Sequence, residues 1–366
     1  MFEDKIAERI LEFKNRKIGP FEIQLNPTNR CNLRCRFCWL RDFDKENLNR
    51  EEIDTRRYKQ IIKECSELKV HTIEITGGGE PLMRKDILEM MKWIKKYKMF
   101  GRLITNGTLF NEKMINEMVK INWDEIVFSL DAPRKEINDF LRGDGFEKVV
   151  NSIKSFQLKK IKLKKDKPLI HIHMVLCNKN YHLLPEMFEF VYNLNCRNLL
   201  VEPIVLLAQK TKAGSELLFR KKDKKMLLKY LKKATQIAHE HNFQTNVDKL
   251  EFELIKKTSK MKEIIEKEGM EEKNPIISLP CYQPFYRMII RPWGIVGPCC
   301  MFDNDGDDIH NKTLKEIWFG DFFENIRKKM MKRELPDFCS KCNPSQIQEN
   351  RKIRTFLKNI IYKKLD

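Results

Sequence analysis

The stretch Phe21–Cys38, FEIQLNPTNRCNLRCRFC, decides how this chain is interpreted. It starts as an apolar, β-rich run and continues directly into a loop with three cysteines. Five further runs of this kind follow. Short apolar stretches bounded by polar residues indicate buried strands. The six predicted strands are Phe21–Leu25, Thr72–Thr76, Arg102–Thr105, Glu125–Leu130, Leu169–Val175 and Leu199–Ile204.

Helical patterns lie between these runs, with apolar residues at three- and four-residue spacing in Glu51–Leu68, Arg84–Lys98, Asn111–Ile121 and His182–Leu194. Repeated strand–helix alternation predicts parallel strands joined by right-handed crossovers, and hence an open or closed α/β barrel. Ligands of such sheets bind at the carboxyl ends of the strands. Residues just after each strand are therefore the first candidates for a site.

The loop after the first strand carries Cys31, Cys35 and Cys38. Three thiolates can bind three irons of a cubane and leave the fourth iron open. A structural zinc site needs a fourth ligand, and no further pair of cysteines follows nearby until Cys281. The spacing therefore favours an iron–sulfur cluster, with zinc as the alternative.

This CxxxCxxC pattern, with an aromatic residue before its last cysteine, resembles the radical S-adenosylmethionine (SAM) superfamily. The resemblance implies a partial (β/α)6 TIM-like barrel in which Cys31, Cys35 and Cys38 hold a [4Fe-4S] cluster. The open iron would chelate the methionyl amine and carboxylate of SAM. Reductive cleavage would then yield a 5′-deoxyadenosyl radical that abstracts hydrogen from a substrate, inside a barrel that excludes water.

The turn after the second strand, Thr76-Gly-Gly-Gly-Glu80-Pro81, matches the family's Gly-Gly-Glu motif. The resemblance implies that the backbone at Gly78 and Gly79 approaches the methionyl ammonium and that Glu80 accepts a hydrogen bond from it. A tight connection or a phosphate-binding nest is the alternative.

Other positions also resemble family positions that contact SAM. Their alternatives are turn chemistry, a surface charge, or packing at the barrel mouth. The implied contacts are Asn106, Ser129 and Asp131 for the amino acid or ribose, Arg142 for the carboxylate, and Phe37 for the adenine.

A second group of cysteines lies in residues 281–342, a region rich in Cys, Pro and Gly. The stretches around Cys281, Cys299–Cys300 and Cys339-Ser-Lys-Cys342 resemble the SPASM/twitch extension, which carries auxiliary [4Fe-4S] clusters. No cysteine follows Cys342, so we expect one fully ligated auxiliary cluster of the shorter twitch type. The implied ligands are Cys281, Cys299, Cys339 and Cys342; Cys300 could replace Cys299, and four thiolates would also suit zinc.

Three further side chains are candidates with ordinary alternatives. Cys177 could donate a hydrogen atom to a substrate radical, although a lone cysteine is more often a buried inert thiol. His173 and Glu202 could bind substrate or act as a base, or they could be satisfied barrel residues. Cys65 and Cys196 are interpreted as packing.

The chain has 366 residues and a net charge of +19, from 71 Lys and Arg against 52 Asp and Glu. The excess could attract an acidic partner or form solvated faces. No apolar run reaches membrane-spanning length, and the charged amphipathic start lacks the apolar core of a signal peptide, so we expect a cytoplasmic protein. In that reducing compartment, eleven cysteines indicate metal binding or catalysis rather than disulfides. The expected regions are an amphipathic helix (1–19), the barrel (20–210), a helical bridge (211–280), the SPASM/twitch domain (281–345) and a basic helix (346–366).

These observations predict a radical SAM enzyme that carries out oxidation, epimerisation or bond formation. The partners implied by the resemblance are a peptide or small-molecule substrate and a flavodoxin- or ferredoxin-type electron donor. The alternative is a non-enzymatic zinc protein that binds nucleic acid through its basic surface. Few aromatic residues alternate with basic ones, so nucleic acid is not the expected partner.

Overall fold

A parallel sheet begins with the strand that carries the first cysteine loop. The computed structural model describes residues 2–13, 18–41, 50–204, 214–250, 261–302 and 306–362. Neighbouring strands pair in the order β1 (Glu22–Leu25), β2 (Thr72–Ile75), β3 (Phe100–Thr105), β4 (Glu125–Ser129), β5 (Leu169–Leu176) and β6 (Asn198–Pro203). All six predicted strands are present and parallel, so the α/β barrel prediction is confirmed.

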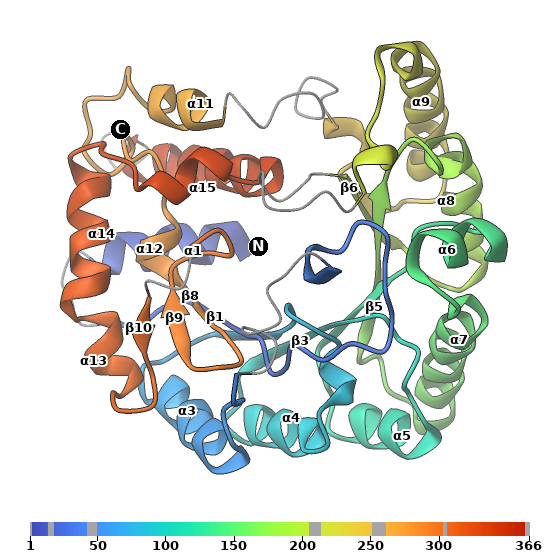
Figure 1. Ribbon diagram of the computed structural model, residues 1–366, viewed down its shortest axis with the longest axis horizontal. Coiled ribbons are helices and arrows are strands. Elements are labelled where there is room, and N and C mark those ends of the chain that lie inside the picture. The colour runs from blue at the N-terminus through green and yellow to red at the C-terminus, as the bar shows by residue number, and fades with distance from the viewer. Residues whose placement is uncertain are drawn as a thin grey trace.

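Helices cover the outer face of this sheet (Figure 1). They are α3 (Thr55–Glu67), α4 (Ile87–Lys96), α5 (Glu112–Lys120), α6 (Lys135–Arg142), α7 (Phe146–Leu163), α8 (Leu184–Asn193) and α9 (Lys224–Glu240). In β5, Ile170, Ile172 and Met174 are buried, whereas His171 and His173, which point to the opposite face, are partly exposed. The strand alternation therefore separates an apolar layer under the helices from a polar inner face of the barrel.

The sheet also continues from the free edge of β1 into the cysteine-rich region. β8 (Arg287–Ile290) pairs parallel to β1, and β9 (Ile295–Gly297) and β10 (Asp307–Asp308) follow it antiparallel. At the other end, β7 (Gln244–Thr245) pairs with β6. Within the described residues this makes one ten-stranded sheet, larger than the six strands that the sequence predicts.

Several helices accompany the cysteine-rich region. They are α1 (Phe2–Glu12), α11 (Met261–Lys267), α12 (Gln283–Tyr286), α13 (Leu314–Trp318), α14 (Asp321–Met331) and α15 (Pro344–Tyr362). The amphipathic α1 packs against α15, and Figure 1 shows α11 to α15 on the side away from α5 to α9. Trp318, Tyr282 and Tyr286 are fully buried, so this region has an apolar core. No helix in the described ranges has the length and apolarity needed to cross a bilayer.

An ion network connects the strands on the inner face. Arg287 Nε lies 2.9 Å from Glu22 Oε1, and its Nη2 lies 3.4 Å from Glu74 Oε1. Arg102 joins Glu74 at 3.3 Å to Glu125 at 2.6 Å. Burial raises the pKa of Glu22 to about 7, although Arg287 opposes the shift. The β1–β8 pairing is therefore reinforced by ion pairs between side chains on different strands.

We predict that Arg287→Met lowers the free energy of unfolding by about 3 kcal/mol, because it leaves buried carboxylates without their partner. The raised pKa of Glu22 means that protonation removes this charge below about pH 7, so the loss is larger above that pH. Urea unfolding of anaerobic protein across pH measures both effects. The control Lys312→Met, which removes the exposed partner of Asp307, should leave the free energy of unfolding nearly unchanged; equal losses in the two variants would contradict the prediction.

Candidate functional site

The first cysteine loop leaves the carboxyl end of β1 and turns back on itself. The backbone N–H of Cys38 donates to Cys35 O at 3.1 Å, and Arg36 N–H donates to Leu141 O at 2.8 Å. Burial raises the pKa of Cys35 to about 11; the Arg142 guanidinium opposes this rise, and the Cys38 and Cys31 thiols add to it. The loop therefore gathers three thiols near the Arg142 guanidinium, with Cys31 the exposed member.

The Gly-rich turn after β2 lies against the chain that leads into this loop. Gly79 N–H donates to Thr28 O at 2.7 Å, and Glu80 N–H donates to Arg30 O at 2.8 Å. A Cβ added at Gly79 would lie 2.0 Å from Arg30 O, and Gly78 has a φ of +61°. Glycine at these positions is therefore required both by close backbone approach and by a left-handed conformation.

Glu80 connects this turn to the end of β3. Its buried carboxylate accepts from the Thr105 hydroxyl at 2.6 Å, from Asn106 N–H at 2.7 Å and from Leu82 N–H at 3.1 Å. Burial raises the pKa of Glu80, and these hydrogen bonds oppose the shift. Asn106 Nδ2 donates to Asn32 Oδ1 at 3.0 Å and lies 4.0 Å from Cys31 Sγ. Thus Glu80 and Asn106, both predicted site residues, meet the cysteine loop.

Asp131 and Arg142 are paired with each other. Arg142 Nε lies 2.7 Å from Asp131 Oδ2, and Arg142 Nη2 donates to Asp131 Oδ1 at 3.0 Å. The Arg142 guanidinium also lies 5.4 Å from the centre of the Phe37 ring. Ser129 ends β4 on the inner face, opposite His173 of β5. These four predicted residues therefore lie around the mouth of the barrel.

Cys177 lies in a small apolar cluster with Leu141, Ile204 and Leu217. Its side chain is buried, and burial raises its pKa to about 12. Phe37 packs against the same cluster. The thiol is thus near the barrel mouth, but it reaches a substrate only if these apolar side chains move.

A pair of polar residues lies near the carboxyl ends of β5 and β6 on the inner face. His173 Nε2 is 3.3 Å from Glu202 Oε2, and the contact lowers the pKa of Glu202 against the effect of burial. Ser345, three residues beyond Cys342, also lowers the pKa of Glu202 and so lies near that carboxylate. The pair therefore bridges the barrel strands and the start of α15.

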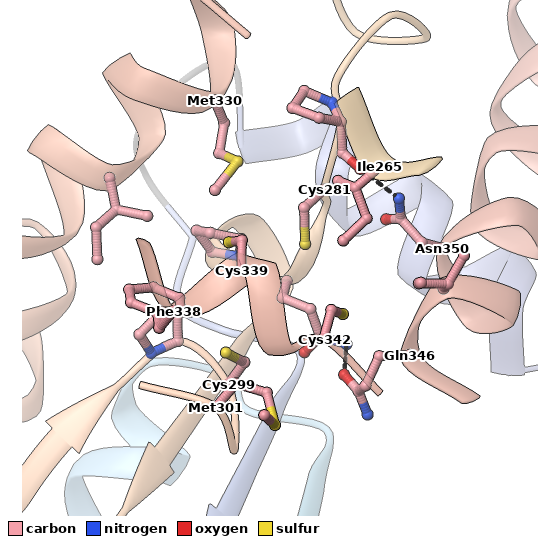
Figure 2. Close-up of a pocket in the computed structure, with 16 residues that line it drawn as sticks. Ile265, Cys281, Cys299, Met301, Met330, Phe338, Cys339, Cys342, Gln346 and Asn350 are labelled. Carbon is pink, nitrogen blue, oxygen red and sulfur yellow. Dashed lines mark hydrogen bonds between the residues drawn. The ribbon is translucent and has the colours of Figure 1, made fainter. Parts of the chain in front are cut away.

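Cys281, Cys299, Cys339 and Cys342 line one cavity, and Figure 2 shows their sulfurs directed into it. Apolar side chains such as Met301, Met330 and Phe338 complete the walls. Burial raises the pKa of Cys281 to about 11 and of Cys299 to about 12, and it raises the pKa values of Cys339 and Cys342 still further. Cys300 is not among the lining residues; its carbonyl accepts from Arg291 at 3.0 Å.

Four thiols around one cavity make the donor set of a fully ligated metal centre. In the described part of the chain, no three His, Cys, Asp or Glu side chains meet closely enough to hold a single metal ion. Four buried thiolates would repel one another in an apolar cavity, so they need a cationic centre that spans all four. A cluster ligated by four thiolates is such a centre.

The sequence analysis missed Asn350, whose amide bonds to the backbone on both sides of Cys281 at 2.7 and 2.9 Å. Asn350 belongs to no motif, and only the packing of α15 brings it to Cys281. Cys65 and Cys196, which the sequence assigns to packing, are buried in the main core.

Comparisons with known proteins agree with this geometry. Residues 25–191 match the family model of the Radical SAM superfamily, and residues 281–343 match that of SPASM, an iron-sulfur cluster-binding domain. Because both cysteine regions fall within these matches, the alternative of a non-enzymatic zinc protein that binds nucleic acid is not supported.

Curated relatives match over about half of this chain. The cofactor-modifying protein of the tungsten-containing aldehyde ferredoxin oxidoreductase of Pyrococcus furiosus is 27% identical over 189 residues, 50% of this chain and 51% of that protein. Fe-coproporphyrin III synthase of Methanosarcina barkeri is 28% identical over 189 residues, 51% of this chain and 44% of that protein. The match thus spans about half the length of these relatives or less.

Solved structures share the fold over more of the chain. SuiB of Streptococcus suis bound to precursor peptide SuiA has a TM-score of 0.66 and 19% identity, covering 87% of this chain and 70% of that one. The enzyme anSMEcpe with bound AdoMet has a TM-score of 0.62 and 17% identity, covering 94% and 100%. A radical SAM domain implies a [4Fe-4S] cluster and SAM, and a SPASM domain implies auxiliary iron–sulfur clusters. With the three-cysteine loop, the Gly-rich turn and the four-cysteine cavity in place, the chain carries a radical SAM domain and a SPASM domain.

Proposed function

We propose that this chain is a SAM-dependent enzyme with two clusters. Cys31, Cys35 and Cys38 would ligate the first, and the second would be one auxiliary [4Fe-4S] cluster held by the four cysteines of the cavity. The observation that carries this proposal is the division of the thiols into a set of three beside the Gly-rich turn and a set of four around one cavity. Three thiolates leave one iron of a cubane open, whereas four close it.

The residues beside the first loop fit the methionyl end of SAM. Glu80 Oε2 accepts one hydrogen bond, from Asn106 N–H, and retains a lone pair for an ammonium group. Asp131 holds the Nε and Nη2 side of Arg142, which directs the Nη1 side toward a carboxylate. Phe37 provides an aromatic surface for the adenine next to that guanidinium.

When bound, the open cluster and SAM supply the one-electron chemistry that generates the hydrogen-abstracting radical of this family. The chain's own contribution is to position the substrate and exclude water from it. Val127 of β4, Val175 of β5 and Leu200 of β6 lie on the inner face and form an apolar part of the barrel wall. This wall would limit quenching by solvent.

His173 and Glu202 are proposed to bind a polar group of the substrate. Their side chains are 21% and 30% exposed, so they remain accessible from the inner face. Because Glu202 is also near Ser345, the pair lies between the barrel mouth and the auxiliary cavity. A substrate held there would be near both cysteine sites.

The four-cysteine site is proposed to act in electron transfer, because four protein thiolates leave no iron open for substrate. Oxidation, epimerisation or bond formation remains the proposed outcome, with a flavodoxin- or ferredoxin-type donor as the source of electrons. A peptide is a suitable substrate class, since the SuiB fold, which this chain shares, was solved with a precursor peptide bound. A small-molecule substrate is the second class.

Anaerobic reconstitution with iron and sulfide should give about eight irons per chain, four for each cubane. The triple variant Cys31→Ala, Cys35→Ala, Cys38→Ala should retain about four irons and lose reductive SAM cleavage. Cys281→Ala with Cys339→Ala should also retain about four but still cleave SAM. Cys300→Ala is the control and should keep the full content. Two zincs and no iron would refute the two-cluster proposal.

Gly79→Ala should reduce the iron content from about eight toward about four, because its Cβ would displace the backbone at Arg30, next to Cys31. The auxiliary signal in electron paramagnetic resonance (EPR) spectra should persist. Gly145→Ala is the matched control, since the closest contact of its Cβ would be a side-chain methyl group, that of Thr108 at 2.8 Å, rather than backbone. A normal iron content in Gly79→Ala would show that this backbone approach is not needed for the first site.

Glu80→Gln should weaken SAM binding by about tenfold to a hundredfold, the value of a hydrogen bond to a charged group. Thr105→Val removes one neutral donor to Glu80 but keeps the carboxylate, so affinity should change by less than about fivefold. Isothermal titration of reconstituted protein with SAM measures both. Similar losses in the two variants would mean that the network, rather than the carboxylate charge, binds SAM.

A further inference from the structure

The C-terminal helix α15 contacts the backbone on both sides of Cys281. The buried Asn350 side chain donates from Nδ2 to Pro280 O at 2.7 Å, and its Oδ1 accepts from Tyr282 N–H at 2.9 Å. Figure 2 shows the Asn350 amide beside the cysteine cavity, with its hydrogen bond to the Pro280 carbonyl. One amide therefore fixes the two peptide groups that flank a cavity cysteine.

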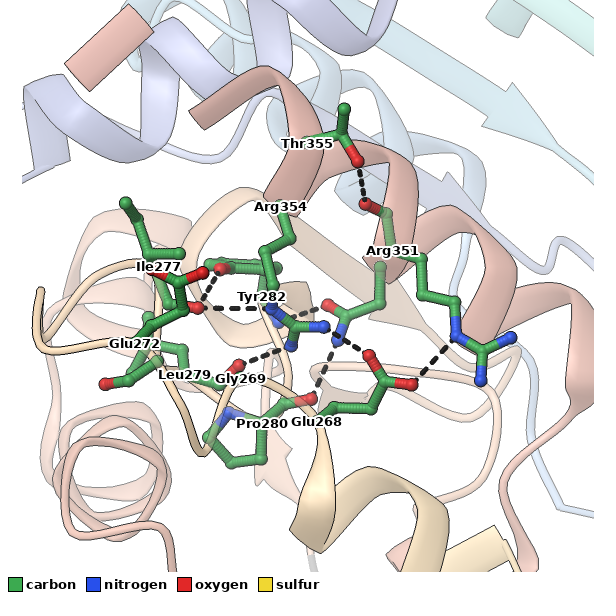
Figure 3. Close-up of polar contacts among 12 residues, drawn as sticks. Glu268, Gly269, Glu272, Ile277, Leu279, Pro280, Tyr282, Arg351, Arg354 and Thr355 are labelled. Atoms are coloured by element: carbon green, nitrogen blue, oxygen red, sulfur yellow. Dashed lines mark hydrogen bonds and ion pairs between the residues drawn. The ribbon is translucent and has the colours of Figure 1, made fainter. Parts of the chain in front are cut away.

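Other residues of α15 hold the same segment. Arg354 donates from Nη2 to Leu279 O at 2.8 Å and from Nε to Ile277 O at 3.1 Å (Figure 3). Glu268 binds Arg354 at 2.5 Å and Arg351 at 2.8 Å, which keeps this part of the helix in place. Two of the basic side chains of α15 are thus paired within the protein rather than available to a binding partner.

The segment after Cys281 is held as well. Gln283 Nε2 donates to Gln346 Oε1 at 2.6 Å. The backbone N–H of Gln283 opposes the rise in the pKa of the Cys281 thiol that burial causes, so this N–H lies on the side of the sulfur. The position of that N–H relative to the sulfur therefore depends on how α15 holds residues 280–283.

We propose that Asn350 is a positioning residue for the auxiliary cluster: it fixes Cys281 and the Gln283 N–H against the Cys281 sulfur, and thereby tunes the cluster's reduction potential. The inference rests on the proposed second cluster. Hydrogen bonds to cluster sulfurs stabilise the more negative reduced state and raise the potential. Loss of this alignment makes the potential more negative.

The variants Asn350→Ala and Asn350→Asp separate the two halves of this contact. Alanine removes both hydrogen bonds. Aspartate keeps the acceptor for Tyr282 N–H but places a carboxylate oxygen against Pro280 O, where a donor is required. Both are made in the full chain that also carries Cys31→Ala, Cys35→Ala and Cys38→Ala, so that the auxiliary cluster alone contributes iron and EPR signals.

Iron content, the EPR spectrum and a redox titration are measured for each protein. We expect a more negative midpoint and an altered EPR spectrum in both Asn350 variants, with about four irons retained. Leu357→Ala, at a fully buried position of α15 away from these hydrogen bonds, controls for helix packing. It should lower the melting temperature and leave the midpoint unchanged.

An unchanged midpoint and spectrum in the two Asn350 variants would overturn the positioning role. A shift of the same size in Leu357→Ala would overturn it too, because general loosening would then explain the effect. If the parent triple variant itself binds no iron, the proposed auxiliary cluster fails, and this result is distinct from either outcome above.

Discussion

The parallel pairing of β1 with β8 is the contact on which the arrangement of both cysteine sites depends. β1 is hydrogen-bonded along both edges, to β2 and to β8, and Asn26 N–H extends the pairing to Ile290 O at 3.0 Å. The first cysteine loop leaves β1, and the hairpin that precedes Cys299 leaves β8. Two segments separated by more than two hundred residues thus start from adjacent strand ends, which fixes the relation between the sites.

Electrostatics makes each group of thiols dependent on a bound cation. Burial raises the pKa values of the cysteines in both groups, and neighbouring thiols raise several of them further. Without a positive centre these side chains remain protonated, so cluster binding must release protons and contribute to stability. The Arg142 guanidinium acts against the raised pKa of both Cys35 and Cys38, and Asp131 pairs with it. The second group lies in an apolar cavity, where a fully ligated centre is well shielded from water.

Between the two groups the inner face of the barrel is polar but largely self-compensated. Arg102 and Arg287 pair with three glutamates at its base, whereas His173 and Glu202 nearer the carboxyl ends remain partly exposed. Polar groups that can still bind a ligand therefore lie where the strands end, close to both cysteine sites. A substrate would therefore meet paired Arg and Glu side chains at the base of the barrel, and partly exposed polar side chains near the carboxyl ends of the strands.

The sequence by itself determined the six parallel strands, the three-cysteine loop and the Gly-rich turn, because hydrophobic periodicity and motif spacing are local properties. Local patterns could not show that β8 joins β1, that Asp131 and Arg142 pair with each other, or that Asn350 holds the backbone around Cys281. The sequence of a four-residue strand, or a single asparagine, does not indicate which distant segment it will contact. Those contacts were decided by the tertiary structure, since burying polar and charged groups requires partners that only packing between distant segments supplies.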